Sequence, residues 1–243
     1  MKQILIFAVV LVVGFMHGRV VCQGSGETVF TAKEFANREV GNAPGTAEQT
    51  FWIRINKDLP PYKFRLIPDA TLHDFPGTEK PHRVGRIEIS TGTPLRLVQT
   101  IQVTTRTSSD LLGRFFTVSD INMDGFADIA VTDDWGAKWS RQRYWLFDKN
   151  RGRFITNTLT NDIFRFMHNG IDLHPESGEI NVNYMPILGV GGLIKETYKI
   201  RREHLVFVKL EELKNTKKGP RIFVKKKVNG KLRTVAIKED NET

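Results

Sequence analysis

Short runs of alternating apolar and polar residues, separated by turn-forming residues, recur along most of this chain. The runs are residues 50–56, 64–67, 84–90, 95–104, 114–119, 129–131, 144–147, 154–156, 180–184, 195–200 and 205–210. A period of two is typical of a strand with one buried face. No long segment has a helical period, and we expect one short helical turn at residues 161–168. The pattern therefore predicts an all-β body made of short antiparallel sheets.

The C-terminal residues carry a separate and stronger local signal. Two alternating runs, residues 221–228 and 231–238, flank the dipeptide Asn229-Gly230. Both positions of a two-residue hairpin turn need positive φ, which Asn and Gly tolerate. We therefore expect a C-terminal β-hairpin extension. The expected division of the chain is a signal peptide at residues 1–24, an irregular lead-in at 25–50, a β-rich calcium-binding domain at 51–213 and the basic hairpin extension at 214–243.

The first 24 residues have the features of a secretory signal peptide. Lys2 supplies the positive charge, Ile4–Phe15 the apolar stretch and residues 20–24 a small-residue exit. The apolar stretch is shorter than the roughly 20 residues of a transmembrane helix. We expect a secreted or periplasmic protein that is not transmembrane, with an uncleaved membrane anchor as the alternative.

Cys22 is the single cysteine of the chain. Arg19 and Val21 fit poorly around a lipid-acceptor cysteine, so we do not expect lipid anchoring at Cys22. Because no cysteine follows it, the mature protein would carry no disulfide, which is unusual for an exported protein. A bound metal ion would be correspondingly more valuable as a staple of the fold.

The net charge of +9 is concentrated at the C-terminus. Residues 214–243 contain ten Lys or Arg and three Asp or Glu, a net of +7, whereas residues 1–213 hold 26 basic and 24 acidic residues. A basic segment of this kind suits an anionic cell-surface polymer or lipid headgroup. Alternatively, its lysines prevent edge-to-edge aggregation of strands. We do not expect nucleic acid as a partner, because the exported chain shows no aromatic platform on which bases could stack.

A spacing typical of a calcium loop lies between two of the predicted strands. Side-chain oxygens fall at positions 1, 3, 5 and 9 of the segment 120–128, and Gly125 at position 6 permits a sharp turn. Calcium prefers six to eight oxygen ligands at about 2.3–2.6 Å, and closely spaced carboxylates repel one another without a cation. We predict a calcium site here, with a metal-free Asx-rich turn as the alternative. The expected ligands are Asp120, Asn122, Asp124, the carbonyl of Phe126, and Asp128.

The residues after this loop indicate which kind of calcium loop it is. An EF-hand needs a Glu at position 12 and then a helix. Position 12 is Val131, which belongs to the β-branched and apolar run Ile129–Val131. The metal is therefore expected to fix a turn between two strands, and the chain is not a calcium sensor.

Several short features recur in a fixed order from about residue 87 to residue 209. They are residues 87–89 with 97–101, the DxNxDGxxD loop at 120–128, Gly136-Ala137, the sequence YWLFD at 144–148, residues 152–154, the glycine-rich turn 189–192, residues 196–198 and the strand 205–208. This series resembles the exported bacterial inhibitors of peptidoglycan hydrolases. That group comprises periplasmic inhibitors of invertebrate-type lysozyme and immunity proteins against lysozyme-like effectors of bacterial-killing type IV secretion systems. The loop alone also resembles FG-GAP propeller repeats.

The resemblance implies an all-β, propeller-like body of short antiparallel sheets, one structural calcium, and a protruding loop that plugs the cleft of the hydrolase. Here that loop would be residues 133–143. It departs from the family pattern in the bulky residues Trp135, Lys138 and Trp139 and in Gln142, which stands where the family has a Tyr.

Residues 133–143 also have the composition of a binding loop. Trp and Arg are enriched at binding hot spots, and the cleft carboxylates of a lysozyme-like glycoside hydrolase lie about 5–9 Å apart. An inserted Arg or Ser could pair with those carboxylates and block catalysis. Alternatively, the tryptophans pack beside the calcium loop and the arginines are solvated. The expected partner-binding residues are Trp135, Gly136, Trp139, Ser140, Arg141 and Arg143.

The chain lacks the usual signatures of a catalytic site, and we expect that it is not an enzyme. Asp133 and Asp134 are adjacent, so in a strand or turn their side chains point apart. The histidines are scattered without the spacing of metal ligands, and no serine lies in a nucleophile-elbow motif. Two hypotheses remain: a calcium-stabilised inhibitor of a lysozyme-like hydrolase, or an FG-GAP-like adhesion or surface-binding module that uses its basic C-terminal extension. Glycosylation at Asn241 stays open.

Overall fold

The computed structural model of the chain describes residues 28–36, 48–68, 84–103, 116–136, 139–166, 170–184 and 193–239. The expected signal peptide at residues 1–24, Cys22 and Asn241 lie outside these residues. In the described ranges, no helix is long and apolar enough to cross a membrane.

The first sheet has five strands, ordered as they occur in the sequence. They are β1 (Val29–Thr31), β2 (Gln49–Arg54), β3 (Tyr62–Pro68), β4 (Val84–Thr91) and β5 (Arg96–Gln102). β1 pairs with β2 in parallel, and the other pairs are antiparallel. The short helix α1 (Ala32–Ala36) follows β1 and buries Phe35, whose ring meets the rings of Phe51 and Phe116 edge-on. The expected irregular lead-in thus contains a strand and a helical turn fixed by one aromatic anchor.

The second sheet has four antiparallel strands, also in sequence order. They are β6 (Phe116–Ser119), β7 (Asp128–Gly136), β8 (Trp139–Asp148) and β9 (Arg153–Ile155). The helix α3 (Thr158–Phe164) follows. It begins earlier than predicted because Asn157 and Thr160 form a capping box, in which each side chain accepts a hydrogen bond from the backbone amide of the other.

The third sheet has six antiparallel strands. They are β10 (Gly170–His174), β11 (Glu179–Tyr184), β12 (Ile194–Arg201), β13 (His204–Thr216), β14 (Gly219–Val228) and β15 (Lys231–Glu239). The predicted hairpin is present, since Val228 pairs with Lys231 and both turn residues have positive φ, 51° at Asn229 and 76° at Gly230. The boundary expected at residue 213 lies inside β13, so the hairpin continues the third sheet.

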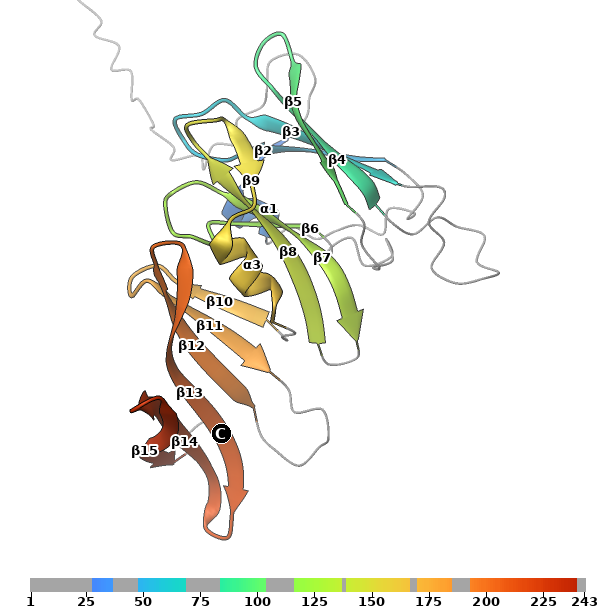
Figure 1. Cartoon of the computed structure of the whole chain (residues 1–243). Coiled ribbons are helices and arrows are strands. Elements are labelled where there is room, and N and C mark those ends of the chain that lie inside the picture. Colours follow the sequence, from blue (N-terminus) through green and yellow to red (C-terminus); the bar gives the residue numbers. More distant parts are fainter. Residues whose placement is uncertain are drawn as a thin grey trace, which may run out of the picture.

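The all-β class is confirmed, because three meandering sheets account for most of the described structure (Figure 1). The three sheets follow one another in chain order and do not close into a barrel. The propeller-like arrangement implied by the resemblance therefore finds no support in this architecture.

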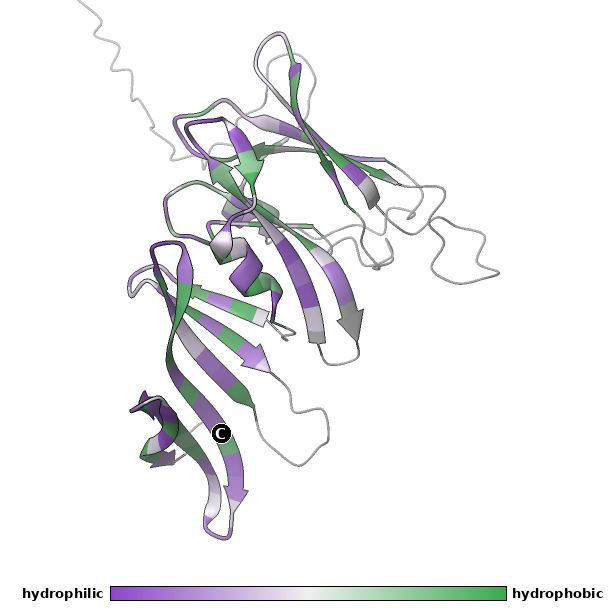
Figure 2. Cartoon of the chain, viewed as in Figure 1, coloured by the Kyte–Doolittle hydropathy of each residue, from purple (hydrophilic) through white to green (hydrophobic). Residues whose placement is uncertain are grey.

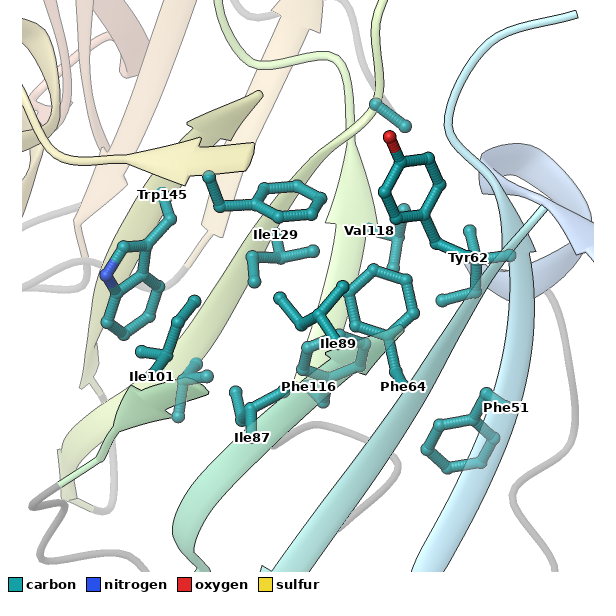
Figure 3. Close-up of a cluster of buried hydrophobic side chains, with 14 of the residues drawn as sticks. Phe51, Tyr62, Phe64, Ile87, Ile89, Ile101, Phe116, Val118, Ile129 and Trp145 are labelled. Carbon is teal, nitrogen blue, oxygen red and sulfur yellow. The ribbon is translucent and has the colours of Figure 1, made fainter. Parts of the chain in front are cut away.

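Two hydrophobic cores hold the sheets together. The first lies between the first and second sheets (Figure 3), where Tyr62, Phe64 and Leu66 of β3 are buried and the residues between them are partly exposed, as a period of two requires. The second core joins β8, α3 and the third sheet through Tyr144, Leu146, Leu159, Ile163, Ile180 and Val182. β14 and β15 lie outside both cores, with Val224 as their single buried residue.

Candidate functional site

The DxNxDGxxD segment forms the connection between β6 and β7, as predicted. Both oxygens of the Asp120 carboxylate accept backbone hydrogen bonds within the loop, from the amide of Asp124 at 3.0 Å and from the amide of Gly125 at 2.9 Å. Gly125 has a φ of +87°, a conformation that suits glycine. The first residue of the motif thus folds the loop around its own side chain.

The side chains at positions 3 and 5 gather beside that of position 1. The amide of Asp124 donates to Asn122 Oδ1 at 3.2 Å as well as to Asp120 Oδ1, so these two oxygens lie close together. Asp124 Oδ1 accepts from the amide of Phe126 at 3.0 Å, and Asn122 Nδ2 donates to Asp124 Oδ2 at 2.9 Å. Three predicted ligands therefore converge on one small region of the loop.

Asp128, the fourth predicted side-chain ligand, is 1% exposed. Its Oδ2 accepts from the amide of Ile121 at 2.9 Å, and its Oδ1 accepts from the amide of Phe147 at 2.8 Å. Phe147 belongs to β8, so this carboxylate ties the start of the loop to a neighbouring strand. The ring of Phe126 stacks on the ring of Phe147, with centroids 5.7 Å apart.

The loop is also attached to the first sheet, by contacts that the sequence did not indicate. Asn56, in the turn between β2 and β3, donates from Nδ2 to the carbonyl of Gly125 at 2.7 Å. The amide of Ala127 donates to the carbonyl of Ile55 at 2.8 Å. The loop therefore lies where the first and second sheets meet, although it is distant from Asn56 in sequence.

The electrostatics of the loop suit a cation. Burial raises the pKa of Asp128 to about 8, an effect that the carboxylates of Asp124 and Asp120 increase and the two backbone hydrogen bonds oppose. Burial also raises the pKa of Asp120, with a further contribution from Asp124. Ionised carboxylates are unfavourable in such a place unless positive charge lies nearby.

The donor set is mixed rather than a cage of carboxylates. Among the described residues, no group of three or more His, Cys, Asp or Glu side chains is placed to hold a metal ion. Such a group would not count the amide oxygen of Asn122 or a backbone carbonyl, both of which suit calcium. The residues present fit a calcium loop in type and spacing, and binding of the ion stays a prediction.

The residues expected to protrude as a loop belong instead to two paired strands. Asp134 pairs with Arg141, Trp135 with Ser140 and Gly136 with Trp139. We name residues 133–143 the partner hairpin. Residues 137–138 and the side chains of residues 135–139 lie outside the described residues. The segment expected as a protruding loop therefore continues the ladder between β7 and β8, and its role as a partner-binding loop stays a prediction.

Both predicted arginines of the partner hairpin are held by one acid. Asp133 is 6% exposed, and its carboxylate contacts Arg141 at 3.0 Å and Arg143 at 2.9 Å. The register shifts between Thr132 and Asp134, which leaves Asp133 in a bulge of β7. Bulges re-aim side chains, and here the bulge gives two arginines of β8 a common partner.

An aromatic ring of α3 completes the cluster. The guanidinium groups of Arg141 and Arg143 lie 4.8 and 4.9 Å from the centroid of the Phe164 ring. Arg141 also contacts Asp134 at 3.6 Å, while its Nε is buried without a hydrogen-bond partner. The arginines are therefore not simply solvated. Asp133 and Phe164 are the residues of this cluster that the sequence did not assign, because their roles depend on a bulge and on the docking of α3.

A cavity of about 720 Å³ opens where the edge strands β5 and β9 meet. The side-chain amide of Gln99 joins the two strands, since Nε2 donates to the carbonyl of Phe154 at 2.7 Å and Oε1 accepts from its amide at 2.8 Å. Thr100, Gln102, Trp145 and Arg153 are among the lining residues. This cavity was not predicted, because it depends on contact between Gln99 and Phe154, which belong to different sheets.

Comparison with known proteins identifies a shared fold. No protein-family model matches the chain, and no curated protein matches its sequence. A solved structure described as "Structure of a Xanthomonas Type IV Secretion System related protein" is similar, with a TM-score of 0.52 and 14% sequence identity. The match covers 78% of this chain and 99% of that chain. At this identity the likeness establishes the fold, and this chain contains nearly the whole of the fold of that protein.

Proposed function

We propose that this chain is an exported, non-enzymatic protein that binds and inhibits a lysozyme-like peptidoglycan hydrolase, and that calcium stabilises the binding hairpin. The observation that carries the proposal is the course of β7. This strand begins at Asp128, the last side-chain ligand expected for calcium, and ends at Gly136 in the partner hairpin. The fold shared with a type IV secretion system related protein supports the same reading.

Calcium bound in the loop would affect the partner hairpin through β7 and β8, the two strands that form the hairpin. Asp120, Asn122, Asp124 and Asp128, with the carbonyl of Phe126, are the residues that would hold calcium, which would neutralise their charge. Asp128 already binds the amide of Phe147 on β8, so the loop and both strands of the hairpin share one anchor. Ordering the loop would therefore stiffen the base of the partner hairpin.

The arginines would supply the contact with the hydrolase. Asp133 and Phe164 hold Arg141 and Arg143 side by side, which reduces the entropy lost when a partner orders them. Glycoside hydrolases carry paired carboxylates in the cleft, and arginine pairs with carboxylates through two hydrogen bonds. A hairpin inserted into that cleft would block the substrate without chemistry of its own.

A panel of c-type, g-type and i-type lysozymes, together with a bacterial effector hydrolase, tests this proposal. The exported chain is titrated against each enzyme in calcium and in EGTA, with hydrolysis of peptidoglycan as the readout. We expect stoichiometric inhibition of at least one enzyme and weaker inhibition in EGTA. Absence of inhibition and of binding across the panel would reject the proposal.

The arginine variants provide the matched control. Arg141→Ala with Arg143→Ala should relieve inhibition of the sensitive enzyme. Replacing two exposed cations, Lys57 in the turn after β2 and Arg96 of β5, by Ala should leave it unchanged. Equal relief by both variants would indicate a general loss of charge or stability rather than a contact made by the partner hairpin.

A further inference from the structure

The second long hairpin, β14–β15, has a charge arrangement that is unfavourable on its own. Lys226 of β14 lies directly opposite Arg233 of β15 in the ladder. Like charges at opposite positions destabilise a pair of strands. Neither side chain forms an ion pair with any residue that the structure describes, and the same holds for Lys231 beside them. An anion bound against these cations would relieve their mutual repulsion.

Other cations nearby are neutralised, which sets this group apart. Lys225 contacts Glu212 at 2.6 Å, and Arg221 contacts Glu239 at 3.5 Å. These pairs lie toward the base of the hairpin. The unpaired cations lie toward the turn at Asn229-Gly230, where no acidic residue occurs between positions 213 and 238.

The same strand exposes large apolar side chains. Every residue of β15 is exposed, and Leu232, Val235 and Ile237 are 50%, 50% and 53% exposed. Val228, at the end of β14, is 38% exposed. Figure 2 shows hydrophobic and hydrophilic positions interleaved over the third sheet. An anionic polysaccharide would require the cations alone, whereas exposed apolar groups next to cations suit the boundary between lipid headgroups and acyl chains.

We propose that the β14–β15 hairpin docks on the surface of an anionic lipid bilayer. β15 is the edge strand of the third sheet and all of its residues are exposed, so the hairpin can approach a surface edge-on. Lys226, Lys231 and Arg233 contact anionic headgroups, and Leu232, Val235 and Ile237 enter the headgroup boundary. This site is separate from the partner hairpin, and the inference goes beyond the proposed inhibition of a hydrolase.

The experiment measures binding of the exported chain to vesicles of phosphatidylcholine, with and without phosphatidylglycerol. The wild type and all variants must begin at the same residue, which mass spectrometry verifies. Lys226→Gln, Lys231→Gln and Arg233→Gln together should weaken binding to the anionic vesicles by about a hundredfold, since each Lys or Arg near an anionic surface contributes on the order of fivefold. The matched control replaces Lys57, Arg96 and Lys149, which are exposed on the other two sheets, and should change binding by less than about threefold.

The apolar residues decide between a bilayer and a soluble polymer. Leu232→Ser, Val235→Ser and Ile237→Ser together should abolish binding to vesicles while leaving salt-sensitive retention on an immobilised anionic polysaccharide unchanged. All three positions are exposed, and near-UV circular dichroism verifies that the variant is folded. Vesicle binding that survives these substitutions, or that is equal with and without phosphatidylglycerol, would overturn the proposal. Retention on the polysaccharide with no binding to either vesicle would assign the hairpin to a polymer instead. These substitutions lie outside the partner hairpin and should leave inhibition of a lysozyme unchanged, so the two proposals fail independently.

Discussion

The two long hairpins of this molecule use cations in opposite ways. In the partner hairpin, Arg141 and Arg143 share the carboxylate of Asp133. In the β14–β15 hairpin, Lys226 faces Arg233 and no acid intervenes. The first arrangement is satisfied inside the molecule and fixes the shape of a surface, whereas the second lacks a counter-charge. The position of the acidic residue, more than the number of cations, therefore distinguishes a preorganised binding surface from a surface that can bind an external anion.

The largest expected effect concerns the anchor at the base of the partner hairpin. Asp128→Ala removes the acceptor of two buried amides, those of Ile121 and Phe147. It should lower the free energy of unfolding by about 2–6 kcal/mol, because each buried amide left without an acceptor costs roughly 1–3 kcal/mol. Urea denaturation in EGTA measures this without a contribution from calcium. Asp148→Ala, at a half-buried turn of the same sheet, is the comparison and should cost less; an equal loss would contradict the anchoring role.

Calcium should stabilise the partner hairpin and have little effect on the β14–β15 hairpin. Adding calcium at about a hundred times its dissociation constant should stabilise the wild type by about 2.7 kcal/mol, and Asp124→Ala should remove most of this gain. Hydrogen exchange should show new protection in β7 and β8 and little change in β14 and β15, because the loop contacts the former strands. Identical melting temperatures in calcium and in EGTA would rule out the metal site.

Local signals made some of this structure predictable. The turn at Asn229-Gly230 depends on two adjacent residues that tolerate positive φ, and the loop at residues 120–128 depends on one short motif. The buried alternation of β3 likewise follows from its own sequence. In each case the residues that determine the structure are close together in the chain.

Contacts between distant residues explain what the sequence did not reveal. Asn56, in a turn of the first sheet, binds the loop of the second sheet, and the short strand β1 is followed by Phe35, which packs in the core shared by the two sheets. The partner hairpin, residues 133–143, was expected as a protruding loop because the family resemblance implies one there. Its ladder continues because Asp133, in a bulge, satisfies two arginines at once. A pairing of this kind requires the register between strands, which composition does not determine.

Removing the shared acid tests whether the partner hairpin is preorganised. Asp133→Ala leaves Arg141 and Arg143 without their principal partner and should cost about 1–3 kcal/mol of unfolding free energy, the usual penalty for a partly buried group left unsatisfied. Glu212→Ala removes the partner of Lys214 and Lys225 on the third sheet. The side chain of Glu212 is 22% exposed, against 8% for that of Asp133, so we expect a loss below about 1 kcal/mol. Equal losses in thermal or urea unfolding would show that the acid of the partner hairpin has no special role.

The smallest expected effect is a gain in stability in the β14–β15 hairpin. Arg233→Glu converts the opposed pair Lys226–Arg233 into an opposite-charge pair, and such cross-strand pairs contribute roughly 0.2–1 kcal/mol. The variant should therefore unfold at slightly higher urea concentration, and the gain should shrink in high salt because both side chains are exposed. Arg233→Gln, which removes the repulsion without adding attraction, should lie between the variant and the wild type. The same substitution to Glu should weaken binding to anionic vesicles, so that stability and binding change in opposite directions. A variant that loses both would mean that Arg233 supports the fold of the hairpin, and the contrast between the two hairpins would then disappear.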